Sequence, residues 1–81
     1  MKPISRAQAN RVRGLLAEYL QCQPDEIFMA GHDHEGLTPG AWSFAYEYDT
    51  ELLAQATHDV VPGSDFWFER INGFALALYR K

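Results

Sequence analysis

The segment from Asp65 to Lys81 constrains the fold more than any other part of the chain. It places Asn72-Gly73 between two runs rich in aromatic and aliphatic residues, which is the strongest short-range signal for a β-hairpin. A two-residue turn would pair Glu69 with Leu76. A three-residue loop, with Gly73 in a left-handed bulge, would pair Phe68 with Leu76 instead.

The two hairpin registers differ in the faces that they create. The bulged register gathers large apolar residues on one face, namely Phe66, Phe68, Phe74, Leu76 and Leu78. The other face then carries Trp67, Glu69, Ala75, Ala77 and Tyr79. Because a one-residue slip exchanges the faces, burial should select the register with the cleaner apolar face. We therefore predict the bulged hairpin, with Phe68 opposite Leu76.

A helix is predicted near the N-terminus, from about Arg6 to Gln21. Ser5 and Gln8 have the spacing of a capping box, and Pro24 ends the helical pattern. An apolar stripe follows helical spacing and consists of Val12, Leu15, Leu16, Tyr19 and Cys22. The position of Cys22 on this stripe predicts a buried, unreactive thiol.

The middle of the chain predicts a strand followed by a second helix. Residues 41–48 alternate strictly, with Trp42, Phe44, Tyr46 and Tyr48 opposite Ala41, Ser43, Ala45 and Glu47. The aromatic row either lines the core or faces outward while the small row seats a helix. Asp49 is positioned to cap the next helix, and Tyr48 to pack on Leu53. The apolar side of this helix would be Leu52, Leu53, Ala56 and Val60, and Pro62-Gly63 would end it. Residues 27–30 are a candidate short strand.

These elements predict one α+β domain over residues 1–81 in the order α-(β)-β-α-β-β. An antiparallel sheet of three or four strands with two helices on one face, closed by the C-terminal β-hairpin, would enclose a single core. With 47% hydrophobic and 22% charged residues, the composition is that of an ordinary globular protein.

Charge is segregated along the chain. All 11 acidic residues lie between Glu18 and Glu69, whereas the seven Lys and Arg residues occupy the two ends, and the net charge is −4. Either the acids only keep the loops soluble, or the fold keeps them together as an acidic surface.

Catalytic and cofactor motifs are absent from the sequence. None of the three serines lies in a Gly-x-Ser-x-Gly elbow, and no metal or phosphate motif occurs, so we predict neither an enzyme nor a cofactor. The run His32-Asp33-His34-Glu35 is the one cluster of metal-ligand types, and we interpret it as a solvated loop. A metal-dependent accessory protein that uses His32 and His34 is the alternative.

The predicted function is that of a non-enzymatic protein-binding module, such as a small acidic inhibitor, immunity or adaptor protein. Its partner would be a larger protein with a basic surface, including one that itself binds nucleic acid. The predicted binding residues are Asp33, Glu35, Glu47, Asp49, Trp67, Glu69 and Tyr79. The sequence leaves a homo-oligomer open.

Other partners and locations are less favoured. A small nucleic-acid-associated regulator would use the basic helix with Arg6, Arg11 and Arg13, but the carboxylates disfavour direct nucleic-acid binding. No apolar run reaches 18 residues and no signal peptide is evident, so no membrane partner is predicted. With Cys22 as the only cysteine, a cytoplasmic location is expected.

Overall fold

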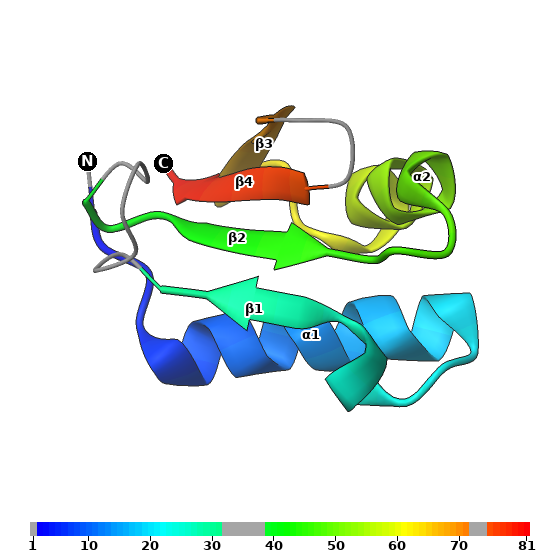
Figure 1. Ribbon diagram of the computed structural model, residues 1–81. Coiled ribbons are helices and arrows are strands. Elements are labelled where there is room, and N and C mark those ends of the chain that lie inside the picture. The colour runs from blue at the N-terminus through cyan, green and yellow to red at the C-terminus, as the bar shows by residue number, and fades with distance from the viewer. Residues whose placement is uncertain (1, 32–38, 72–74) are drawn as a thin grey trace.

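The computed structural model describes residues 2–31, 39–71 and 75–81 of the chain (Figure 1). The elements are α1 (Arg6–Leu20), the short 3-10 helix η1 (Pro24–Glu26), β1 (Phe28–Ala30), β2 (Trp42–Ala45), α2 (Thr50–Val60), β3 (Phe66–Arg70) and β4 (Ala75–Arg80). The strands form one antiparallel sheet in the order β1-β2-β4-β3. The predicted α+β class, element order and C-terminal hairpin are confirmed.

Helix α1 begins at the predicted capping box. The Ser5 side chain accepts a hydrogen bond from the Gln8 backbone N–H at 3.1 Å, and the Gln8 side chain accepts one from the Ser5 N–H at 2.9 Å. The predicted apolar stripe is only partly correct, because Leu15 and Tyr19 are 39% and 40% exposed. The buried face is instead made of Ala9, Val12, Leu16 and Ala17, since the alanines let the helix pack closely on the core.

Strand β2 is shorter than the predicted strand over residues 41–48. Ala45 pairs with Phe28 on one side and Ala75 on the other, and these are the first residues of β1 and β4. On the β1 side Ala45 is therefore the last paired residue of β2, and residues 47–48 form a turn before α2. Of the aromatic row, Trp42 and Phe44 line the core and are both 3% exposed, whereas Tyr46 is half-buried and Tyr48 is exposed.

Helix α2 begins after the predicted cap. Asp49 Oδ1 accepts a hydrogen bond from the Leu52 N–H at 3.0 Å. Leu53 is fully buried as expected, but Leu52 is 40% exposed, and Thr57 takes a buried position by donating its hydroxyl to the Leu53 carbonyl. The predicted packing of Tyr48 on Leu53 is wrong, because Tyr48 is 75% exposed and its ring meets Tyr46 edge-on.

The hairpin has the predicted faces but not the predicted register. Phe68 pairs with Leu78 rather than with Leu76, and the Ile71 N–H donates to the Ala75 carbonyl. A shift of two residues leaves every side chain on its predicted face, because side chains alternate with a period of two. Gly73 and Phe74 lie outside the described residues, so the predicted left-handed bulge is not addressed.

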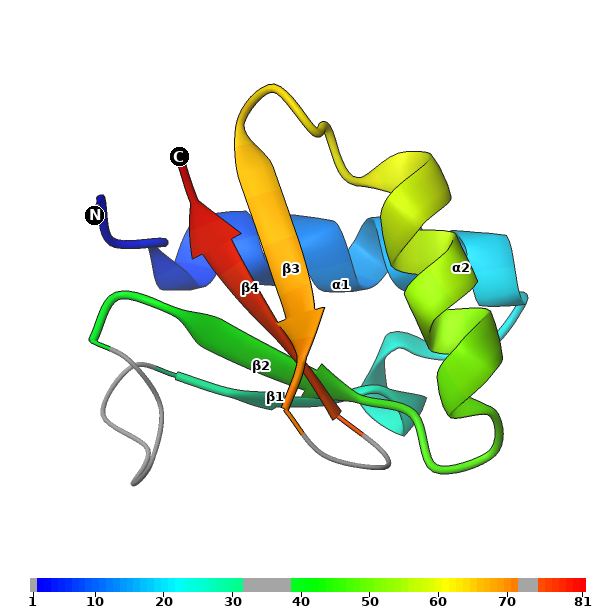
Figure 2. The ribbon, with the colours of Figure 1, turned by 90° about the horizontal axis from the view of Figure 1, so that it is seen from above.

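Both helices pack on one face of the sheet, which we call the inner face. The core there joins α1 and α2 to inward side chains of all four strands, with Ile4, Leu16, Ile27, Leu53 and Leu78 at most 1% exposed. In Figure 2, α1 crosses behind β3 and β4 and α2 stands beside them. The N-terminal segment is tied to the core by Trp42, whose indole N–H donates to the Ile4 carbonyl at 2.7 Å.

Candidate functional site

The second face of the sheet, which we call the outer face, is covered by neither helix. The strand registers place on it Phe28 and Ala30 of β1, Ser43 and Ala45 of β2, Ala75, Ala77 and Tyr79 of β4, and Trp67 and Glu69 of β3, with Ile71 next to Ala75. Almost all of these side chains are apolar. The outer face is therefore a second apolar surface in a chain whose main core lies on the other side of the sheet.

Three large apolar side chains on the outer face remain exposed. Phe28 is 58%, Ile71 45% and Trp67 41% exposed, and all three lie on or next to the edge strands β1 and β3. The central residues Ala75 and Ala77 are small and buried, at 7% and 0% exposed. Large exposed side chains therefore lie at both edges of the face, with small side chains that are already buried between them.

Trp67, Glu69 and Tyr79, three of the predicted binding residues, meet at one margin of the outer face. The Trp67 and Tyr79 rings are stacked, with centroids 4.1 Å apart and planes inclined by 15°. The Tyr79 hydroxyl donates to Glu69 Oε1 at 2.7 Å, which leaves Tyr79 only 5% exposed. This arrangement fixes the rotamers of both rings, so little side-chain entropy would be lost when a partner covers Trp67.

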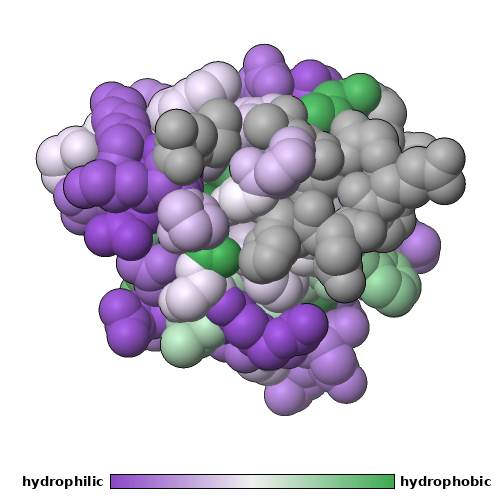
Figure 3. All heavy atoms as spheres, turned by 90° about the vertical axis from the view of Figure 1, so that its left-hand side faces the viewer, coloured by the Kyte–Doolittle hydropathy of each residue, from purple (hydrophilic) through white to green (hydrophobic). Residues whose placement is uncertain are grey.

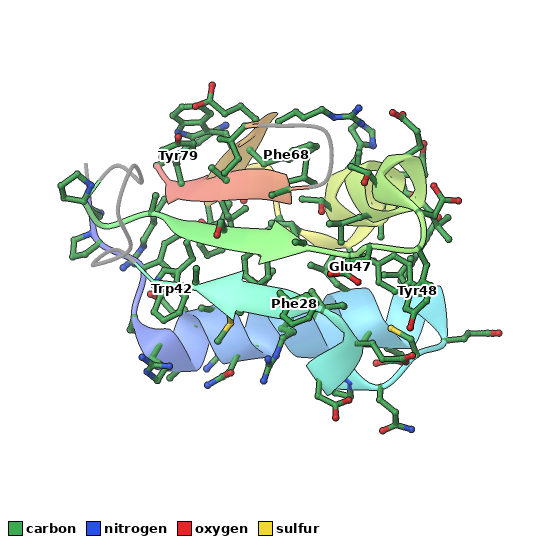
Figure 4. The ribbon with its side chains drawn as sticks, in the orientation of Figure 1. Phe28, Trp42, Glu47, Tyr48, Phe68 and Tyr79 are labelled. Carbon is green, nitrogen blue, oxygen red and sulfur yellow. The ribbon has the colours of Figure 1, made fainter. Side chains whose placement is uncertain are left out.

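Glu47 and Asp49 lie at the other end of the sheet and play different parts. Glu47 lies in the turn that follows β2, two residues after Ala45, and its side chain is exposed. Figure 4 shows Phe28, Glu47 and Tyr48 gathered at this end of the strands. The carboxylate of Asp49 caps α2, so part of its hydrogen-bonding capacity serves the fold.

Among the described residues, many of the carboxylates gather at one end of the molecule. The C-terminal end of α1, η1 and the β2–α2 connection lie at one end of the molecule and both termini at the other (Figure 1). The first end carries Glu18, Asp25, Glu26, Glu47, Asp49 and Glu51, and we call it the acidic end. Of these, Glu51 is neutralised by Arg70, at 2.7 Å.

The opposite end of the molecule carries cations. The backbone of Lys2 forms an isolated antiparallel β-bridge with Arg80 on β4. The Arg6 guanidinium lies 5.2 Å from the centroid of the Trp42 ring. In Figure 3, which looks onto this end, hydrophilic residues cover much of the surface that is not grey. Cations and carboxylates are thus concentrated at different ends, although Asp65 lies beside Arg80 and Arg70 lies beside Glu51.

Cys22 and Tyr46, near the acidic end, are only half-buried, so the predicted full burial of the Cys22 thiol is not observed. Burial raises the pKa of the Cys22 thiol, and the neighbouring carboxylates of Glu26 and Asp25 raise it further. Burial is also the main cause of the raised pKa of Tyr46, with Cys22 and Glu26 adding to it. A raised pKa lowers the thiolate fraction of Cys22, and the thiolate is the reactive form of a cysteine.

Within residues 2–31, 39–71 and 75–81, no three His, Cys, Asp or Glu side chains gather in a way that could hold a metal ion. The predicted ligands His32 and His34 and the predicted binding residues Asp33 and Glu35 lie outside the described residues. His58, the described histidine, pairs with its neighbour Asp59 at 3.3 Å. Over the same described residues, no helix is long and apolar enough to cross a bilayer.

Sequence reasoning missed Phe28 and Ile71 as members of the outer face. Phe28 belongs to the run 27–30, which has no polar alternation to show which side faces solvent, and Ile71 directly precedes the Asn72-Gly73 turn signal. Their exposure follows from their places on and beside edge strands, and a strand's place in a sheet is not a local property.

Comparisons with known proteins find no relative. The chain matches no protein-family model, and no curated protein or solved structure is significantly similar to it.

Proposed function

We propose that this chain is a non-enzymatic protein-binding module that docks on a basic surface of a larger protein through its outer face. One observation carries the proposal: Phe28, Ile71 and Trp67 are 41–58% exposed on a sheet face that neither helix covers. Folded monomers rarely leave such apolar area open over one face unless it is used for binding. An inhibitor, immunity or adaptor role and a cytoplasmic location are part of the same proposal.

Trp67 and Phe28 are the expected anchors of the interface. Large aromatic side chains that become fully covered contribute most of the binding energy in protein complexes. Trp67 is held in place by its stack on Tyr79, and Phe28 is the more exposed of the two. Each truncation to alanine is expected to cost about 2 kcal/mol or more of binding free energy, mainly by faster dissociation.

The carboxylates supply selectivity for a basic partner. Glu47 and Glu69 flank the apolar residues, and the acidic end continues the negative surface beyond Glu47. Complementary charge of this kind raises the association rate and is screened by salt, with a Debye length of about 10 Å at 0.1 M. It also disfavours a nucleic-acid backbone as the ligand of this face.

The test begins with the chain immobilised in a lysate of its native host. The captured protein is purified, and its association and dissociation rates are measured. Trp67→Ala and Phe28→Ala should each accelerate dissociation about 30-fold or more, which corresponds to about 2 kcal/mol. Leu52→Ala is the matched control, because Leu52 is 40% exposed but lies on α2.

Charge reversals separate this proposal from that of a nucleic-acid regulator. Glu47→Lys with Asp25→Lys should slow association, whereas Arg11→Glu with Arg13→Glu should leave it unchanged or faster. The proposal fails if Trp67→Ala and Phe28→Ala bind like Leu52→Ala. It also fails if the chain binds nucleic acid and loses that binding with the arginine reversals.

A further inference from the structure

A groove separate from the outer face lies between the first half of α1 and the end of the hairpin where β3 begins and β4 ends. Its volume is about 260 Å³. Its walls are Gln8, Arg11, Val12 and Leu15 of α1, Pro62 and Asp65, Phe66 of β3 and Arg80 of β4. Figure 2 shows this end of β3 and β4 above the N-terminal half of α1. The groove is on the inner side of the sheet, away from the proposed protein-binding surface.

The groove is cationic because the core row of β4 ends in an arginine. The alternation that directs Leu76 and Leu78 to the inner face continues to Arg80, which pairs with Phe66 on β3. Arg80 is only half-exposed, and Arg11 approaches the same groove from α1. Two guanidinium groups thus line a groove in a chain whose net charge is −4.

Neither guanidinium is neutralised within the part of the chain that the structure describes. Arg70 has its ion pair with Glu51, but among the described residues Arg11 and Arg80 make no ion pair. Asp65 is the one carboxylate in the groove wall, and it lies beyond ion-pair distance of both arginines. The groove therefore has an excess positive charge and donors free for a ligand.

Apart from Gln8, the rest of the lining is apolar. Val12 is 4% and Leu15 39% exposed, and Phe66 and Pro62 complete the apolar wall. A cavity of about 150 Å³ is enough to hold benzene, so this groove can hold a ring together with a short chain. The geometry suits a ligand with an apolar body and an anionic head.

We propose that this groove binds a small amphipathic carboxylate. The apolar body lies against Val12, Leu15 and Phe66, and the carboxylate accepts hydrogen bonds from Arg11 and Arg80. Planar guanidinium groups match the geometry of a carboxylate, and the single negative charge of such a head meets less repulsion from Asp65 than a phosphate dianion would.

The test is an NMR titration of the ¹⁵N-labelled chain with 3-phenylpropionate. Saturable amide shifts should centre on Val12, Leu15, Phe66 and Arg80, with a Kd of about 1 mM or tighter for a ligand of this size. Two control ligands separate the contributions of the carboxylate and the apolar body to binding. 3-Phenylpropan-1-ol lacks the charge, and acetate lacks the apolar body. Each should bind at least about tenfold more weakly, because each lacks one of the two contacts.

Variants identify the residues that recognise the ligand. Arg11→Gln and Arg80→Gln should each weaken binding of 3-phenylpropionate about tenfold, since a charge-assisted hydrogen bond is lost. Arg13→Gln is the matched control, because it removes one charge from the same helix without touching the groove. Arg11 is exposed on α1, so Arg11→Gln should keep the fold even if Arg80→Gln does not.

Three results would overturn the inference. The first is equal binding of the acid and the alcohol. The second is a set of shifts centred on the outer face around Trp67, or no saturable shifts at all. The third is an equal loss of binding in Arg13→Gln and Arg11→Gln, which would mean that net charge rather than the groove attracts the ligand.

Discussion

Replacing Trp42 by phenylalanine should destabilise this protein far more than the same replacement at Trp67. The Trp42 indole N–H donates to the carbonyl of Ile4 at 2.7 Å, and the two residues are 3% and 0% exposed. Phenylalanine fills most of the site but donates no hydrogen bond, so the Ile4 carbonyl loses this donor inside the core. Trp67 is 41% exposed on the outer face, so Trp67→Phe makes the same chemical change at an exposed position and serves as the comparison.

The magnitude follows from two contributions. Removing one partner of a buried hydrogen bond costs about 1–3 kcal/mol. The smaller ring also leaves a space, which adds about 1 kcal/mol. The sum of about 2–4 kcal/mol is a large part of the total stability, which is about 4–12 kcal/mol for a chain of this length.

Urea unfolding followed by far-ultraviolet circular dichroism measures this change without relying on tryptophan fluorescence. With a slope of about 1 kcal/mol per molar urea, Trp42→Phe should lower the midpoint by about 2 M or more. Trp67→Phe should shift it by less than about 1 M. Equal shifts of the two midpoints, or a Trp42→Phe shift below about 0.5 M, would refute the role given to the Trp42–Ile4 hydrogen bond.

Two further predictions concern glycines and one carboxylate. Gly14→Ala should raise the free energy of unfolding by about 0.5–1 kcal/mol, because a Cβ in the middle of α1 meets open space. Gly40→Ala should lower it by about 1 kcal/mol or more, because Gly40 has φ +90°. Thermal unfolding of the two variants measures both changes. Hydrogen bonds from Gln55 and, to a lesser extent, Tyr19 hold the pKa of Asp59 below its ordinary value. The ionised Asp59 carboxylate therefore stabilises the fold fully above about pH 4, and this stabilisation is lost as the pH falls through the lowered pKa. An NMR pH titration should show this pKa moving up in Gln55→Ala and Tyr19→Phe, and an unchanged value would contradict the assignment.

The candidate site was only partly accessible from the sequence. The predicted residues Trp67, Glu69 and Tyr79 do meet. Trp67 and Glu69 are two residues apart on β3 and share a face, and the hairpin places Tyr79 of β4 opposite Trp67. Glu47 and Asp49 were both predicted to bind the partner, and the structure gives Asp49 a second role as the cap of α2 while Glu47 remains exposed. The charged groove was not predicted, since it depends on where α1 lies across the end of β4.

Local chemistry in the sequence determined the elements of this protein and the faces of its hairpin. Ser5 with Gln8 set the start of α1, Asp49 set the start of α2, and period-two alternation assigned Phe68 and Leu78 to the inner face. Each of these features depends on contacts within a few residues or on the alternation of apolar and polar residues, which decides the face that is buried.

Only the tertiary structure decided the hairpin register and the exposure of its residues. Registers that differ by two residues present the same faces, so alternation cannot distinguish Phe68 opposite Leu76 from Phe68 opposite Leu78. Ala75 is buried because β4 is a central strand, and Phe28 is exposed because β1 is an edge strand. The order of strands in the sheet is set by contacts between segments far apart in the chain, and it therefore decides which apolar residues are left for a partner.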